Sequence, residues 1–398
     1  MSFIDGIFDK AANFVRDAFD IGEDEPKQAA KPAPRSKDLA ADSRTTFESS
    51  PAPAAAATSS MLDRIIDRAG QRSAPRDGQA PASSTLSAAD RPPHMTYDRT
   101  TAPPQQSTQV ATGSAARAQV LDVAAGTADT AEASTAAANV QKGLDYYATT
   151  FGRDGIDGAG SGVDVLVNDR RTDTNGEEMF AGNGGYFSLP GADGQLREAI
   201  HFGVGKTYSA TKGQVEQLAM GNADDLAIHE LTHGIIRKET GHLGGEADEA
   251  GATNEGIADV MAAAATRDWR IGEGMYTAGS DYRAMRDIAN PDDPTTIHGL
   301  WTSMDDVQRE RAAGRELEEH WASGVVSTAA QRVQARFGGE EGWKVVENVF
   351  YDTIDNSRLG DMSFQAVAGA LRTSAASVYG AGSSVDQVFD EELRRAGL

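Results

Sequence analysis

The chain has 398 residues and a formal net charge of −23, and 39% of its residues are hydrophobic. That length allows two or three domains, but the hydrophobic share is low for a chain packed throughout. An acidic surface repels nucleic acid and anionic membranes, so we expect neither as a partner. Cysteine is absent, which excludes disulfides, thiolate metal sites and cysteine nucleophiles, and any metal must be held by His, Asp or Glu.

Residues 1–20 place apolar side chains at helical spacing and predict an amphipathic N-terminal segment. Such a segment either docks on its own protein or is recognised by a partner such as an export machinery, and both interpretations stay open. The segment lacks the basic leader and continuous apolar run of a usual Sec signal. No apolar stretch approaches the length of a membrane span. We expect a protein that is secreted by a non-Sec route, or that is otherwise cytoplasmic.

Residues 21–116 are rich in Ala, Pro, Ser, Thr and Gln, as in PAPAAAATSS (51–60). Such a composition buries too little apolar surface to offset chain entropy. The sequence therefore predicts a disordered segment here, which serves as a linker or a prosegment.

From about residue 117 the composition changes, and a helical pattern runs up to Gly152. Strand-like segments then lie between Gly-rich turns. These segments are VDVLVNDR (163–170), GGYFSLP (184–190) and REAIHFGVG (197–205). Helical patterns dominate after residue 222. A β-rich part followed by an α-rich part predicts an α+β fold of two lobes, 117–240 and 241–398, with a cleft between them.

Two glycine-rich stretches resemble ligand-binding loops without completing their patterns. GVGKT (203–207) would end a phosphate-binding loop, but Ile200 stands where that loop requires glycine. RDGIDGAGSG (153–162) lacks the acidic spacing and closing glutamate of an EF-hand. We interpret both stretches as turns.

The segment DLAIHELTHGIIRK (225–238) has the pattern of a buried helix and contains HELTH (229–233). His229 and His233 are four residues apart and project from one face, which brings two imidazole nitrogens to a shared point. Glu230 is next to the first histidine, close enough to act on water at a metal. The alternative is a polar helix face with two ordinary histidines, but the motif favours zinc.

A second predicted helix, ATNEGIADVMAAAA (252–265), offers a third ligand. Catalytic zinc usually has three protein ligands, and Glu255 completes the set. Asp259 lies one turn later and can accept a hydrogen bond from the free ring nitrogen of a ligand histidine, which fixes its tautomer. An exposed acidic helix face is the alternative, but the apolar residues around these two carboxylates indicate a packed helix.

HELTH followed by NEGIAD resembles the HExxH…NExxxD pattern of the thermolysin-like zinc endopeptidases. Four further segments resemble this family in consistent order, so that the likeness covers about 117–398. They are DYYATTFGRDGIDG (145–158), NGGYF (183–187), DWRIGEGMYTAGSDYRAM (268–285) and HWASGVVSTAA (320–330). The resemblance implies an α+β thermolysin-like zincin with an N-terminal β-rich lobe, a central zinc-binding helix and a C-terminal mainly helical lobe. Residues 1–116 do not resemble the family's large propeptide and are expected to be a disordered extension.

The resemblance also implies the reaction, which is peptide hydrolysis with an apolar residue preferred after the scissile bond. Zinc would be bound by His229, His233 and Glu255. Glu230 would take a proton from water and pass it to the leaving amine, and His320 would stabilise the oxyanion.

The family's substrate contacts map onto six positions of this chain. Arg283 would hydrogen-bond a substrate carbonyl, and Asn183 would hold the substrate backbone. An apolar pocket would accept the side chain after the cut. Its walls are implied to be Leu226, Ile271, Met275 and Tyr282.

Two catalytic features of the family are missing from the sequence. The family has a tyrosine between its two zinc helices, whereas residues 241–251 of this chain contain none. His242 lies in this stretch and is either a substitute for the tyrosine or an ordinary loop histidine. The family also places an aspartate five residues before the second catalytic histidine, where this chain has Arg315. Glu316 or Glu319 would then be left to orient His320.

The family's calcium site is only partly matched. Asp225, Asp268 and Glu273 correspond to calcium ligands, but Arg270 replaces an acidic one. We predict one weak calcium ion or none.

A second function stays open, because the missing tyrosine and aspartate would also suit a zinc-bound pseudoprotease that acts as a binding module. The N-terminal extension would suit a delivered effector, and it would equally suit an autoinhibitory prosegment. In the main interpretation the partner is a protein or peptide substrate.

Overall fold

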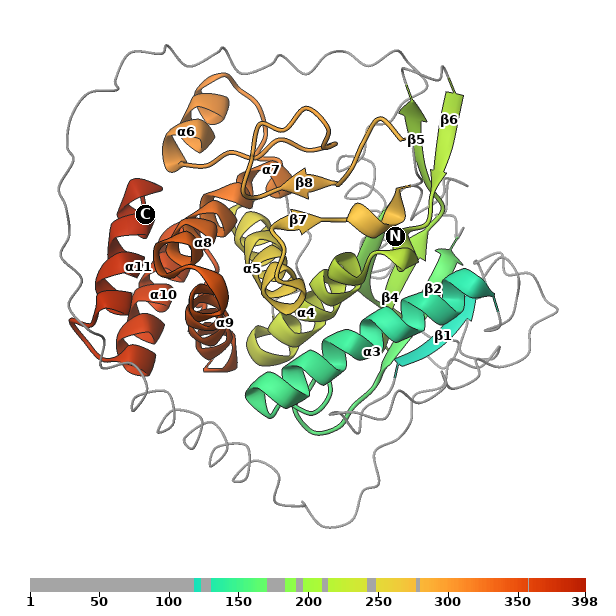
Figure 1. The fold of residues 1–398 in the computed structure, drawn as a ribbon, viewed down its shortest axis with the longest axis horizontal. Helices are drawn as coiled ribbons and strands as arrows, with labels where there is room; N and C mark the ends of the chain where they lie inside the picture. Colours follow the sequence, from blue (N-terminus) through green and yellow to red (C-terminus); the bar gives the residue numbers. More distant parts are fainter. Residues whose placement is uncertain are drawn as a thin grey trace, which may run out of the picture.

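The computed structural model describes residues 118–122, 130–169, 183–190, 196–209, 214–241, 248–276, 280–356 and 358–398. The segments predicted at 1–20 and 21–116 lie outside these residues. A lobe containing strands and a lobe of helices are joined by two central helices (Figure 1). This is the α+β architecture that the sequence predicts.

The first lobe is built on a four-stranded sheet in the order β1-β2-β4-β3. β1 pairs parallel with β2, β2 pairs parallel with β4, and β3 is antiparallel to β4 at the edge. The strands are β1 (Ala118–Asp122), β2 (Val163–Asp169), β3 (Gly184–Pro190) and β4 (Leu196–Gly203). The three predicted strands are confirmed to within two residues. β1 was not predicted, and neither was the hairpin of β5 (Gly205–Ser209) and β6 (Gln214–Leu218).

Helix α3 (Ala131–Phe151) packs against this sheet and against the first central helix. Its N-terminus is capped by the Thr130 side chain, which accepts a hydrogen bond from the Ala133 amide. It ends at Gly152, whose φ of 70° is left-handed and favours glycine. The helix end that the sequence predicts at Gly152 is therefore confirmed.

The first central helix, α4 (Asp224–Thr240), is buried on nearly all sides because it lies between the lobes. Acidic residues in its first turn and basic residues in its last turn complement the helix dipole. At its crossing with α3, a Cβ on Gly143 would lie 2.8 Å from a Leu231 methyl group, so a larger side chain there would push the helices apart.

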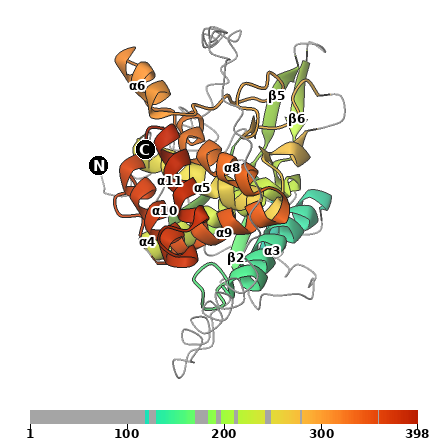
Figure 2. The ribbon, with the colours of Figure 1, turned by 60° about the vertical axis from the view of Figure 1, so that its left-hand side comes forward.

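The second central helix, α5 (Glu249–Thr266), forms the axis of the helical lobe and contacts α7, α8, α9 and α10. Figure 2 shows α8, α9 and α10 gathered around it. The helices that follow α5 in the chain are α6 (Met304–Ala312), α7 (Glu319–Ala322), α8 (Gly324–Phe337), α9 (Gly339–Asp355), α10 (Phe364–Tyr379) and α11 (Ser384–Arg395). Within the residues described, no helix is long and apolar enough to cross a membrane.

Between α5 and α6 the chain is mostly irregular. It forms the short pair of β7 (Arg270–Ile271) and β8 (Arg286–Asp287), with the 3-10 turn η3 (Glu273–Met275) after β7; a similar turn, η2 (Met220–Asn222), precedes α4. These short elements position residues beside the metal-ligand group described next.

Candidate metal centre and active site

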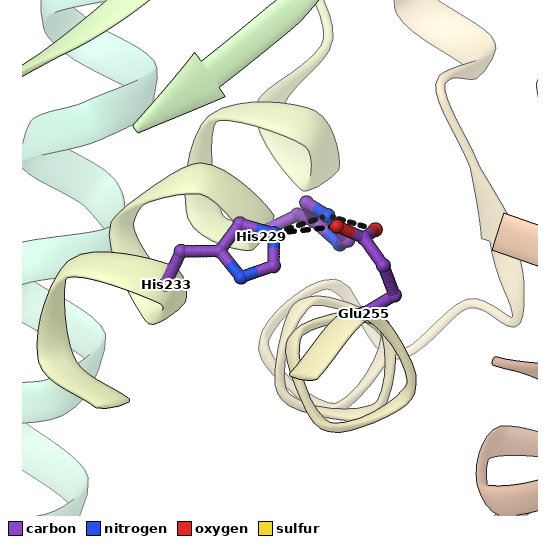
Figure 3. A group of neighbouring side chains, drawn as sticks. All are labelled: His229, His233 and Glu255. Atoms are coloured by element: carbon purple, nitrogen blue, oxygen red, sulfur yellow. Dashed lines mark hydrogen bonds and ion pairs between the residues drawn. The ribbon is translucent and has the colours of Figure 1, made fainter. Parts of the chain in front are cut away.

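His229, His233 and Glu255 converge on one point between α4 and α5 (Figure 3). The two histidine Nε2 atoms are 3.0 Å apart. The carboxylate oxygens of Glu255 lie 3.1 Å from Nε2 of His229 and 3.2 Å from Nε2 of His233. In the part of the chain that the structure describes, this is the only group of three or more such side chains able to share a metal ion.

The other ring nitrogens show why this group requires a cation. Nδ1 of His229 lies 3.0 Å from Asp259, and Nδ1 of His233 lies 3.2 Å from the Asn254 side-chain oxygen. Both Nδ1 atoms are therefore donors, and in the neutral rings both Nε2 atoms carry lone pairs. A proton or a metal ion must then lie between these lone pairs and the carboxylate. Ligands about 2.0 Å from a tetrahedral zinc are about 3.3 Å apart, close to the distances observed, so the residues fit the ion.

The electrostatics of the group also favour positive charge. Burial lowers the pKa of His229, but the carboxylates of Glu255 and Asp259 outweigh it and raise that pKa to about 10. Burial raises the pKa of Glu255, but the three nearby histidines hold it well below its ordinary value. Glu255 is thus an ionised carboxylate held among cationic or metal-binding rings.

Glu230 is buried beside the ligands, and its carboxylate faces the start of β3. A Cβ on Gly184 would lie 3.3 Å from Oε1 of Glu230, so glycine allows strand and carboxylate to approach. Burial raises the pKa of Glu230 above its ordinary value, against the opposing effect of the histidines. A raised pKa makes the carboxylate a stronger proton acceptor.

His320 is also brought to this group, from the first turn of α7. Its Nε2 lies 3.7 Å from Glu255, and its Nδ1 lies 2.9 Å from Oε1 of Glu318. The prediction that Glu316 or Glu319 makes this contact is wrong, because Glu318 makes it. Glu318 caps α7 by accepting the Trp321 amide at 2.6 Å, which turns its carboxylate toward the ring. Glu316 is exposed.

The arginine beside the metal-ligand group is Arg286, whereas Arg283 was predicted to contact a substrate carbonyl. Arg283 is exposed. Arg286 is fully buried on β8 and forms a bidentate pair with Asp259, with its Nε and Nη2 2.6–3.0 Å from the carboxylate oxygens. Its Nη2 lies 3.6 Å from Glu255. Its Nη1 is buried without a hydrogen-bond partner among the described residues.

Comparison with known proteins agrees with this geometry. Residues 79–237 match the family model described as the catalytic domain of thermolysin metallopeptidase, and residues 247–395 match the alpha-helical domain of the same family. The chain belongs to the thermolysin family of metallopeptidases. The catalytic-domain match begins at residue 79, earlier than the lobe boundary predicted at 117, and that boundary stays a prediction.

Individual members of the thermolysin family are distant relatives. The chain is 27% identical over 268 residues to neutral protease B of Bacillus subtilis, covering 66% of this chain and 44% of that protein. It is 26% identical over 258 residues to an extracellular elastase of Staphylococcus epidermidis, covering 62% and 43%. The chain thus spans less than half the length of these curated relatives.

Among solved structures, the chain is similar to the precursor of protealysin, a metalloproteinase from Serratia proteamaculans. The TM-score is 0.54 at 20% identity, and the alignment covers 85% of this chain and 97% of that one. This likeness supports the thermolysin-like fold.

The residues predicted to contact substrate are only partly gathered together. Leu226, Ile271 and Met275 are buried in one apolar core. Tyr282 is partly exposed and lies outside that core, with its ring centroid 6.4 Å from that of Tyr276. Asn183 is buried directly before β3, and its backbone oxygen accepts a hydrogen bond from Gly203 at 2.9 Å.

The acidic residues predicted for calcium have protein partners. Arg270 lies 3.0 Å from Asp268 and 2.9 Å from Glu273, and so places a guanidinium between them. Asp225 is buried and accepts the Gly272 amide at 2.9 Å. The weak or absent calcium binding stays a prediction. His242 lies outside the described residues.

Proposed function

We propose that this protein is a zinc-dependent endopeptidase that prefers an apolar residue after the scissile bond. The observation that carries the proposal is the convergence of two histidine lone pairs and a carboxylate, with a second carboxylate, Glu230, directly beside them. Membership of the thermolysin family and the proteases among its relatives support it.

In this proposal His229, His233 and Glu255 hold the zinc ion. Bound there, zinc would polarise the substrate carbonyl and lower the pKa of water. Asp259 accepts the Nδ1 proton of His229 and so keeps the Nε2 lone pair directed at the metal.

Glu230 is the general base and then the general acid. It takes a proton from the attacking water and delivers it to the nitrogen of the leaving amine. Its burial suits both steps, because a carboxylate with a raised pKa accepts a proton readily and can pass it on.

His320 and Arg286 are the proposed donors to the substrate. Nε2 of His320 lies on the side of Glu255, where it would stabilise the oxyanion, while Glu318 holds its Nδ1. We assign to Arg286 the carbonyl contact predicted for Arg283, because the buried Nη1 of Arg286 lacks a hydrogen-bond partner among the residues described.

Asn183, at the start of the edge strand β3, would hold the substrate backbone. The apolar core of Leu226, Ile271 and Met275, with Tyr282 near it, would form the pocket for the side chain after the cut.

The decisive experiment is Glu230→Gln. The variant should retain one zinc ion per chain by metal analysis but lose peptide hydrolysis by at least about 100-fold, the scale of a missing general base. Unchanged turnover would refute the role of Glu230. Zinc-loaded wild-type protein without any hydrolysis of casein or a quenched peptide would instead favour the pseudoprotease alternative.

A matched pair of variants tests the role of Glu318. Glu318→Gln should lower kcat about tenfold, since the charge that orients His320 is removed. Glu316→Gln changes an exposed glutamate two residues away and should leave kcat unchanged. Equal effects of the two would contradict the assignment.

We also propose that the protein acts outside the cell, as the name of the extracellular elastase suggests for that relative. The non-Sec route, the effector role and the docking of residues 1–20 are further parts of this proposal. Deleting residues 1–116 tests them. Lost export with unchanged activity supports a delivery signal, whereas higher activity supports a prosegment.

A further inference from the structure

Another buried histidine, His298, lies beside His320 but outside the metal-ligand group. The ring centroids are 5.8 Å apart and the ring planes are inclined by only 17°, so the two imidazoles stack. His298 comes from the irregular segment between β8 and α6, and its side chain is buried. Neither the motifs of the sequence nor the proposed reaction accounts for this residue.

Hydrogen bonds hold His298 between the two segments that carry the proposed substrate donors. Its backbone amide donates to the oxygen of Met285 at 2.8 Å, directly before Arg286. Its Nδ1 lies 3.3 Å from Nε1 of Trp321, directly after His320. His298 therefore connects β8 to α7.

The contact with Trp321 determines the state of the His298 ring. An indole nitrogen can only donate, so Nδ1 of His298 must be the acceptor. The ring is then neutral, with its proton on Nε2. Burial and the neighbouring His320 lower the pKa of His298 to about 3, which agrees with a neutral ring. A neutral ring can stack on His320 without repelling positive charge there.

We propose that His298 is a positioning residue for His320, an inference that rests on the proposed endopeptidase function. Glu318 holds Nδ1 of His320, but a hydrogen bond at one ring nitrogen does not by itself fix the tilt of the ring. His298 lies against the face of the ring and prevents the tilt. His320 Nε2 is thereby kept in the direction of the oxyanion before substrate binds.

Two substitutions separate stacking from hydrogen bonding. His298→Ala removes both, and we expect kcat to fall about tenfold while KM changes less than about twofold, because alignment in the transition state is lost and substrate binding is not. His298→Phe keeps a flat ring and should recover most of kcat. A phosphonate peptide that mimics the tetrahedral state should lose affinity for His298→Ala in parallel with kcat/KM.

Two tryptophan variants provide the matched control. Trp321→Phe removes the donor to His298 but keeps the stacked ring, so it should lower kcat no more than His298→Phe does, with no further loss when combined with His298→Ala. Trp301→Phe changes the ring that packs edge-on against Trp321, with centroids 6.1 Å apart, but leaves the donor intact, and should have wild-type kcat. Nitrogen NMR of labelled histidines should show His298 neutral with the proton on Nε2.

The outcomes distinguish this inference from the proposed function. If wild-type protein hydrolyses peptides but His298→Ala keeps full kcat, or if NMR finds the proton on Nδ1, the positioning role is overturned. If wild-type protein with zinc has no hydrolysis, the endopeptidase proposal fails first, and the NMR result still tests the geometry of His298.

Discussion

Two clusters of arginine and carboxylate lie at opposite ends of β7 and β8, and they differ in burial. Arg286 and Asp259 have side chains 1% and 0% exposed, next to Glu255. Arg270 and its partners Asp268 and Glu273 have side chains 42%, 40% and 37% exposed. The same pairing of arginine with carboxylate therefore occurs once in the low-dielectric interior and once in contact with water.

The difference shows what makes an acidic cluster a metal site. Around Arg270 the protein supplies its own cation, and water screens the remaining charge. At the buried cluster Arg286 pairs with Asp259, so Glu255 and the two histidine nitrogens are available to bind a separate cation. The zinc site is identified by buried metal-ligand atoms that converge on one point, and not by the number of carboxylates.

The largest expected effect is that of Glu255→Gln. The amide keeps the size of the side chain but supplies no negative charge, so zinc should be lost on dialysis and hydrolysis should fall at least about 1,000-fold. Metal analysis and a peptide assay measure both. Full zinc content in this variant would show that the ligand set is wrong.

Asp259→Asn should be the most damaging change to stability. It leaves the buried guanidinium of Arg286 without its counter-charge, at a cost of about 3–5 kcal/mol in the free energy of unfolding. Zinc affinity should also fall about 10–100-fold. The exposed counterpart, Asp268→Asn, should cost less than about 1 kcal/mol in the same urea titration. Equal losses would remove the distinction between the clusters.

Asp225 tests the effect of burial within the acidic region. Burial raises its pKa to about 6, so the folded state favours the protonated form. The contribution of Asp225 to stability should be highest below about pH 4, decline as the pH rises toward about 6, and then stay level. Asp225→Asn should abolish this decline and stabilise the protein at pH 7 by about 3 kcal/mol. A decline that persists in the variant would assign it to another group.

Arg270→Ala should have the smallest effect without added ions, below about 1 kcal/mol, because its ion pairs are exposed. It should, however, remove the cation that pairs with the carboxylates of Asp268 and Glu273, so that they can bind another cation. Calcium should then raise the melting temperature of the variant more than that of the wild type. Tight binding of two calcium ions by zinc-loaded wild-type protein, measured by calorimetry, would contradict the role given to Arg270.

Helices α4 and α5, and the residues that converge between them, could be predicted from the sequence. Helical geometry places residues four apart on one face, so His229 with His233, and Glu255 with Asp259, were predictable from spacing alone. The end of α3 at Gly152 and strands β2, β3 and β4 were likewise predictable, since they depend on local patterns.

The other charged residues that join that centre could be identified only from the folded chain. Arg283 and Arg286 are indistinguishable as isolated charges until the pairing of β7 with β8 buries the second. Glu318, and not Glu316 or Glu319, orients His320 because its side chain caps the N-terminus of the short helix α7. His298 has no local pattern at all. These contacts join segments far apart in the chain or depend on one turn of backbone, and side-chain periodicity does not encode them.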